Sequence, residues 1–237
     1  MRAARLVALF EILLCSDFPT QLAIGATLRV FGILPKTAHG DLSVRYVVAL
    51  SLADTALLIG LILFLLRSHG ERPRKVFLGS RPVAGEFTLG LWMTLVVFVI
   101  AIAVLGVVQL AAPFLHNVPQ NPLQDMIRRP RDAGVFAVVV VIAGGVREEI
   151  QRAFILHRFD QWLGGAYVGV VVWSLMFGVG HLLQGYDVAL ATALMGAFWA
   201  IVYVRRRSIV APLVSHSGFN LLELAQYLAA RAVIGGR

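Results

Sequence analysis

The segment Gly144–Phe159 reads GGVREEIQRAFILHRF and places a dense group of charges directly after an apolar run. Residues 133–143 carry no charge and are rich in valine, as in the first half of a transmembrane helix. A charged side chain at bilayer depth costs roughly 3 kcal/mol or more, so it persists only if it is paired or lines a wet cavity. The charged residues to be accommodated are Arg147, Glu148, Glu149, Arg152 and Arg158.

Helical spacing predicts how these charges pair. Glu148 and Arg152 are four residues apart and Glu149 and Arg152 are three apart, so Arg152 can pair with either carboxylate. A simpler interpretation is a helix end whose side chains extend toward lipid headgroups. That interpretation explains Arg158 better than it explains two adjacent acids.

The composition indicates an integral membrane protein. Of the 237 residues, 59% are hydrophobic and only 14% are charged, whereas soluble domains carry about 25% charged residues. The net charge of +8 comes from basic residues at the ends of apolar runs. Membrane lipid is therefore the expected partner, and nucleic acid is not. Cys15 is the only cysteine, so no disulfide framework or thiolate metal cluster is expected.

The apolar runs predict an all-α fold, a polytopic transmembrane bundle of about six to eight membrane helices. The segment 6–31 is interrupted by charges and Pro19, and it forms either one broken span or two short helices at the interface. Residues 1–132 are expected to hold N-terminal membrane helices and loops, and residues 133–237 the core of the same membrane domain. Trp199 needs no role beyond interfacial anchoring and packing. The expected spans are Tyr46–Leu66, Phe87–Leu110, Ala133–Phe159, Gly165–Leu183, Val188–Val204 and Ile209–Val233.

Two later helices also carry polar groups at bilayer depth. FGVGH places Phe177 and His181 one turn apart, and HSGFN places His216 and Asn220 on one helical face. A single buried histidine is more often a packing residue than a catalyst. Together with a carboxylate, however, such a set can activate water: the acid takes a proton, one histidine orients the water, and a second histidine and an amide stabilise an oxyanion.

The three motifs together resemble those of the CPBP family, the CAAX-protease and bacteriocin-processing (abortive-infection-like) intramembrane proteases. Its eukaryotic members are the type II CAAX prenyl endopeptidases. The resemblance covers residues 133–223 and includes the order and spacing of the motifs. It implies a metal-free, cofactor-free glutamate-type endopeptidase with catalytic residues Glu148, His181, His216 and Asn220, supported by Glu149, Arg152 and Phe177.

One position departs from the family pattern, which is Glu-Glu-x-x-x-Arg. Here Arg152 comes one residue early and Ala153 occupies the usual arginine position, a shift of about 100° around the helix. The shift leaves the role of Arg152 open, although its spacing from Glu148 still suits an ion pair.

The resemblance also implies a multi-pass protein of a prokaryotic plasma (inner) membrane that cleaves a membrane-associated or lipidated protein or peptide. Two alternatives remain open at this point. In a zinc-dependent membrane protease, Glu148, His181 and His216 would be the metal ligands. In a non-catalytic scaffold, immunity factor or transporter, the same acids would serve structure or transport.

Overall fold

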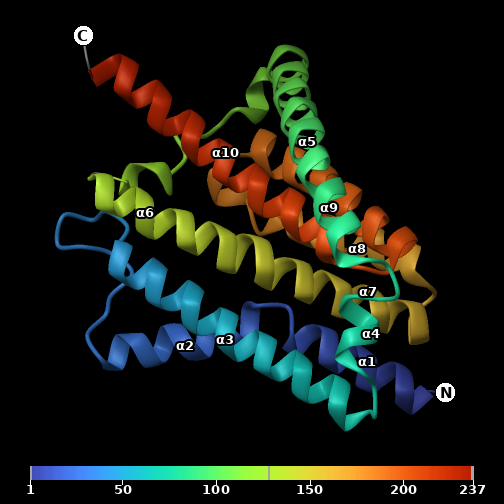
Figure 1. The fold of residues 1–237 in the computed structure, drawn as a ribbon. Helices are drawn as coiled ribbons and strands as arrows, with labels where there is room; N and C mark the ends of the chain where they lie inside the picture. The colour runs from blue at the N-terminus through green and yellow to red at the C-terminus, as the bar shows by residue number, and fades with distance from the viewer. Residues whose placement is uncertain (1, 128, 236–237) are drawn as a thin grey trace.

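A computed structural model describes residues 2–127 and 129–235 of the chain. Every regular element in these ranges is a helix, which confirms the predicted all-α class (Figure 1). The helices are α1 Arg2–Leu14, α2 Phe18–Val30, α3 Val44–Ser68, α4 Pro73–Phe77, α5 Val83–Ala111, η1 Pro113–Leu115, η2 Gln124–Met126, α6 Pro130–Val139, η3 Val140–Arg147, α7 Glu148–Trp162, α8 Ala166–Val179, η4 Leu182–Gln184, α9 Tyr186–Arg206 and α10 Val210–Gly235.

One long helix runs through the middle of the molecule and separates two groups of helices. It consists of α6, η3 and α7 without interruption, and η3 is a π-helix. In Figure 1, α1, α2 and α3 lie on one side of it, and α5, α8, α9 and α10 lie on the other. Single π-helical turns inside α-helices often mark functional sites, and here the π segment ends where the two adjacent acids begin.

The N-terminal segment forms two helices and not one. α1 and α2 are separated at Cys15–Asp17, and Asp17 has a φ of 67°, in the left-handed region. Asp is one of the few residues other than Gly that adopts this conformation readily. Pro19 then occupies the first turn of α2, where its missing N–H has no helical partner to lose.

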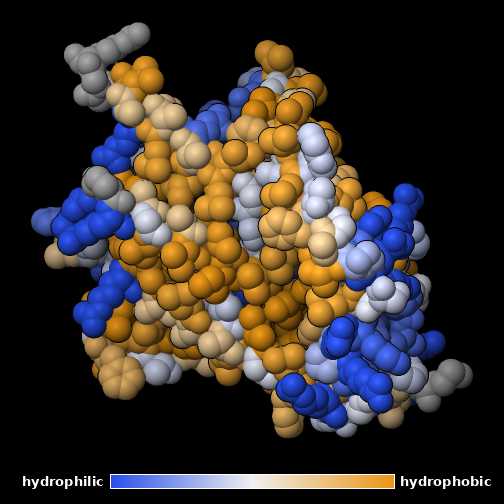
Figure 2. Space-filling model, viewed as in Figure 1, coloured by the Kyte–Doolittle hydropathy of each residue, from blue (hydrophilic) through white to orange (hydrophobic). Residues whose placement is uncertain are grey.

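The surface of the bundle is that of a membrane protein. By length and composition, four segments of the described chain could cross a bilayer: residues 2–30, α3, α5 and α9. α8 is apolar but has only 14 residues, and the long central helix carries the charged segment. Figure 2 shows a broad hydrophobic surface across the middle, with hydrophilic residues gathered at two opposite ends.

Candidate active site

Glu149 and His216 form the buried centre of the site. α10 packs against η3, and this packing brings the second turn of α10 beside the first turn of α7. His216 Nδ1 lies 2.8 Å from Glu149 Oε1, and the same oxygen accepts a hydrogen bond from the Arg152 guanidinium. Glu149 is 1% exposed. A carboxylate held by two donors in this way is fixed in position.

The neighbouring carboxylate, Glu148, is held differently. Its Oε1 accepts a hydrogen bond of 3.1 Å from Arg147 Nη2, while Oε2 lies 3.7 Å from His216 Nε2. The latter separation is too long for a hydrogen bond. The Glu148 side chain is 14% exposed. One oxygen of Glu148 is therefore free to accept a proton from a small molecule beside the imidazole.

The two glycines before the acids allow α10 to approach this closely. A Cβ on Gly144 would lie 2.6 Å from Asn220 Nδ2, and a Cβ on Gly145 would lie 2.0 Å from Ser217 Oγ. Both distances are shorter than real Cβ contacts. A side chain at Gly144 would displace the Asn220 amide, and one at Gly145 would also crowd the Ser217 Cα at 3.3 Å and so push against the backbone of α10. Asn220 Nδ2 uses this proximity to donate to the Val140 carbonyl, at 3.2 Å.

Aromatic rings surround the His216 imidazole. Trp199 stacks on it with a centroid separation of 4.0 Å and an interplanar angle of 18°, and the Phe177 ring is nearly perpendicular to it, at 85°, with a centroid separation of 6.0 Å. The Trp199 indole N–H donates to Ser215 Oγ, which fixes the plane of the stack. Trp199 was predicted to be a packing residue, but at 1% exposed it is also one wall of the site.

His181 lies outside α8, which ends at Val179, so the predicted span to Leu183 is too long. The cause is a tighter turn, in which the His181 amide bonds to the Gly178 carbonyl. His181 Nδ1 lies 2.8 Å from the Phe177 carbonyl, and the two rings are 4.9 Å apart. Because a carbonyl only accepts, Nδ1 carries the proton, and the neutral ring presents Nε2 as an acceptor.

The structure thus brings the three motifs together, with different degrees of contact. Glu148, Glu149 and His216 interact directly, whereas His181 reaches them through the Phe177 ring. Within the described residues, no hydrogen bond joins His181 to either carboxylate. No group of three or more His, Cys, Asp or Glu side chains among those residues is arranged to hold a metal ion.

The early position of Arg152 does not remove it from the site. Arg152 is fully buried, and its guanidinium lies 5.0 Å from the Phe177 ring centroid and 5.6 Å from that of Trp199. Of the two pairings that the spacing allowed, the structure has the one with Glu149. In place of the i+4 pairing with Arg152, Glu148 is paired with Arg147.

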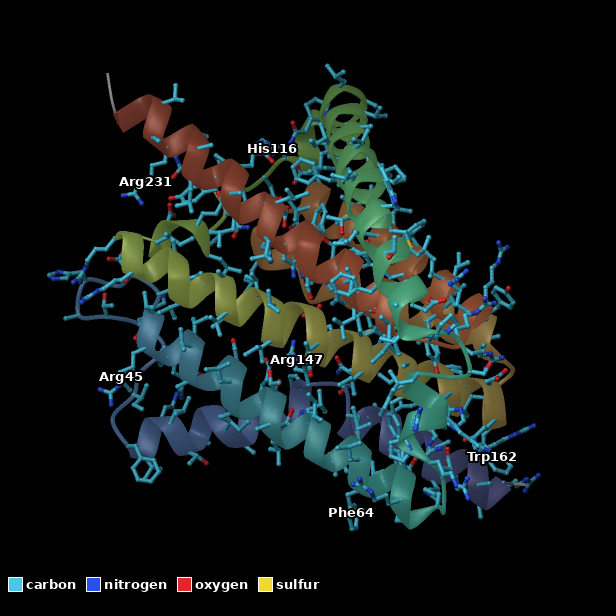
Figure 3. The ribbon with its side chains drawn as sticks, viewed as in Figure 1. Arg45, Phe64, His116, Arg147, Trp162 and Arg231 are labelled. Atoms are coloured by element: carbon cyan, nitrogen blue, oxygen red, sulfur yellow. The ribbon has the colours of Figure 1, made fainter. Side chains whose placement is uncertain are left out.

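Sequence reasoning missed Asp17 and Asp54, which lie beside the site, and gave Arg147 no role. Arg147 Nη1 lies 2.6 Å from Asp54 Oδ2 of α3, and Nη2 lies 3.6 Å from Asp17 Oδ2. Figure 3 shows Arg147 midway along the central helix, between that helix and α3. A signal was present, because Asp54 is the only charged residue within residues 46–66 and so required a partner.

An all-helical membrane bundle with carboxylates and histidines in its interior defines the class, a polytopic membrane protein with ionisable groups buried between its helices. Residues 130–222 match the family model described as Type II CAAX prenyl endopeptidase Rce1-like. This part of the chain is similar to that family of peptidases, and the match confirms the resemblance drawn from the three motifs. It begins at α6, ends within α10 and contains all three motifs. No curated protein and no solved structure matches the chain.

Proposed function

We propose that the protein is a glutamate-type intramembrane endopeptidase in which Glu148 is the general base. The observation that carries this proposal is the contrast between the adjacent acids: Glu149 is 1% exposed and its Oε1 is held by both Arg152 and His216, whereas the Glu148 side chain is 14% exposed and its Oε2, without a hydrogen bond among the described residues, lies 3.7 Å from the imidazole. A general base must reach the proton that it abstracts. Of the two carboxylates, Glu148 is the more accessible to a water molecule.

In the proposed reaction, Glu148 takes a proton from water as the oxygen attacks the peptide carbonyl. His181 Nε2 accepts a hydrogen bond from the same water and orients it. The proton held by Glu148 then passes to the leaving amine. We assign catalysis to the part of the chain from 133 to 237, with the N-terminal helices supporting it.

The oxyanion of the tetrahedral intermediate needs donors, and we assign His216 and Asn220 to this role. His216 Nε2 donates only when both ring nitrogens carry protons, and the buried Glu149 carboxylate stabilises the positive ring through Nδ1. Asn220 Nδ2 has a second hydrogen besides the one donated to Val140. The loss of one such donor reduces the rate by about 10² to 10³.

The substrate class follows from the position of the site. Because the acids lie on a helix inside the bundle, we expect a protein or peptide that enters from the membrane, including a lipidated one. We assign the protein to a prokaryotic plasma (inner) membrane, and fractionation of expressing cells checks this assignment. Membrane lipid is the remaining expected partner.

The direct test is cleavage of a peptide library, with and without prenylated cysteine, by protein purified in detergent and by Glu148→Gln. Wild-type cleavage that Glu148→Gln lacks, at equal folded yield, supports the proposal. A parallel arm adds a strong chelator such as 1,10-phenanthroline. Unchanged activity agrees with water activation by side chains alone, whereas loss with rescue by zinc would establish the metalloprotease alternative.

A further inference from the structure

The N-terminal helices contribute acids to the neighbourhood of Glu148, a part of the molecule outside the family match at 130–222. Asp54 lies on α3 and is fully buried, and Asp17 lies at the break between α1 and α2. Both approach the guanidinium of Arg147, whose Nη1 is 2.6 Å from Asp54 and whose Nη2 is 3.6 Å from Asp17. Arg147 in turn binds Glu148 at 3.1 Å.

Further hydrogen bonds hold Asp54 and the break between α1 and α2 in place. Gln21 Nε2 donates to Asp54 Oδ2 at 3.4 Å, so this oxygen is held from α2 as well as by Arg147. Gln151 of α7 donates to the Cys15 carbonyl at 2.7 Å, which ties the break between α1 and α2 to the catalytic helix. Left-handed backbone at a non-glycine residue is uncommon, and here it lies at Asp17.

The charges explain what this arrangement does. Arg147 carries one positive charge and faces three carboxylates: Asp17, Asp54 and Glu148. A guanidinium that served Glu148 alone would pair with it fully and weaken it as a base. With Asp54 on Nη1, Arg147 offers only Nη2 to Glu148 Oε1 and leaves Oε2 turned toward His216.

We infer that Asp54, assisted by Asp17, is a positioning residue that acts on Glu148 through Arg147. This inference rests on the proposed function for its kinetic consequence, but the link between the three residues can be tested without activity. The groups that face Glu148 are Arg147 on its own helix and His216 from α10, with Asp54 from α3 and Asp17 from the α1–α2 break behind Arg147.

The kinetic test compares Asp54→Asn with Glu86→Gln, a matched control. Glu86 is likewise a buried acid in an apolar helix paired with an arginine, Arg206 at 2.6 Å, and it is not part of the site. Loss of fine positioning can cost up to about 10²-fold in rate. We expect Asp54→Asn to lower kcat about 10- to 100-fold with little change in KM, and Glu86→Gln to lower stability but not kcat per folded protein.

A double-mutant cycle asks whether Asp54 acts through Arg147. If it does, Asp54→Asn combined with Arg147→Gln should be about as slow as Arg147→Gln alone, because coupled residues are not additive. Multiplied effects in the double variant would overturn the inference, as would an unchanged kcat in Asp54→Asn. If Asp54→Asn does not fold, Asp17→Asn is tested in its place. We expect a smaller loss of kcat in Asp17→Asn, and an unchanged kcat would again contradict the inference.

The test without activity uses nuclear magnetic resonance of ¹⁵N-arginine-labelled protein. The Arg147 guanidinium signal is assigned by its loss in Arg147→Lys. We expect it to shift in both Asp54→Asn and Glu148→Gln and to stay in place in Glu86→Gln. An unchanged signal in Asp54→Asn overturns the inference. If the wild type cleaves no peptide, the proposed function fails, and this signal alone decides whether the link exists.

Discussion

Two clusters of the same residue types involve α7, one at each end of the helix, and they are bonded differently. The anchor cluster, at the C-terminal end, consists of Glu11, His69, Glu71, His157 and Arg158. Each of its four carboxylate oxygens has a partner: Glu11 binds His69 and Arg158, and Glu71 binds Arg158 and His157. In the proposed catalytic cluster, Glu148, Glu149, Arg152 and His216, both bonds to Glu149 fall on Oε1, and among the described residues the nearest charged partner of Glu148 Oε2 is His216 at 3.7 Å.

The difference shows which feature would allow a buried cluster of charged residues to take part in proton transfer. The anchor cluster joins three parts of the chain, which are α1, α7 and the segment that follows α3. It lies near a cavity of about 310 Å³ that Glu11 and Trp162 line. Figure 3 places Trp162 near the end of the bundle and Arg147 in its middle. With every oxygen bonded, the anchor cluster holds helices together. With one oxygen unbonded beside a histidine, the catalytic cluster can accept a proton.

The largest expected effect on rate distinguishes His181, near the catalytic cluster, from His69 in the anchor cluster. We expect His181→Ala to lower kcat by about 10² to 10⁴, the range for losing a group that assists proton transfer, with little loss of stability. His69→Ala in the anchor cluster should leave kcat unchanged, because the imidazole pairs with Glu11 and, among the described residues, with neither Glu148 nor Glu149. Steady-state kinetics and melting curves on both variants measure this. Equal losses of rate would contradict the division between the clusters.

Arg152→Met should have the largest effect on stability. It removes a fully buried cation and leaves the Glu149 carboxylate with His216 alone, a change that costs about 3 to 5 kcal/mol. The control is Arg207→Met, which breaks an exposed pair with Asp160 and should cost about 1 kcal/mol or less. Unfolding in denaturing detergent gives both values. Similar losses in the two variants would show that the Arg152 pair is not structurally important.

Gly145→Ala tests the close approach of α10 to η3. Alanine in a helix is normally favoured over glycine by about 1 kcal/mol, so the sign of the effect is diagnostic. We expect Gly145→Ala to destabilise by about 1 to 3 kcal/mol because its Cβ would meet Ser217. Gly60→Ala, where nothing lies within 4 Å, should be neutral or stabilising. A stabilised Gly145→Ala would mean that the helices are not in contact there.

Part of the fold and of the candidate site could be predicted from the sequence. The polar residues of the three motifs were identifiable because each is costly in an apolar helix, and the all-α class followed from the apolar runs. The partner of each charge was not predictable, because helical spacing offered Arg152 two acids. Only the packing of α3 against the central helix decides that Arg147 is the arginine bound to Glu148. The π-helix and the early end of α8 also arise from packing, which leaves no periodic signal.

The smallest expected effect concerns pH and the anchor cluster. Partial burial would raise the pKa of Glu71, but hydrogen bonds from Arg158 and His157 outweigh it and hold the pKa below its ordinary value. The ionised form therefore stabilises the fold above the unfolded pKa of about 4.3, and this contribution is lost as the pH falls through the lower folded pKa.

We expect the melting temperature of the wild type to fall more steeply than that of Glu71→Gln as the pH drops below about 4.3. The difference should correspond to about 1 kcal/mol or less, because the pair is partly exposed and screened by solvent. Melting curves from pH 3 to 7 measure it. Parallel curves for the two proteins would show that the Glu71 charge does not stabilise the fold.

The central claim is that the two adjacent acids have different roles, and one comparison tests it most directly. The single-turnover cleavage rates of Glu148→Gln and Glu149→Gln are measured at equal concentrations of folded protein. Glutamine preserves the size of the side chain but cannot take the proton. The account predicts no cleavage above background for Glu148→Gln and a reduced but measurable rate for Glu149→Gln. Cleavage by Glu148→Gln, or a greater loss in Glu149→Gln, would contradict it.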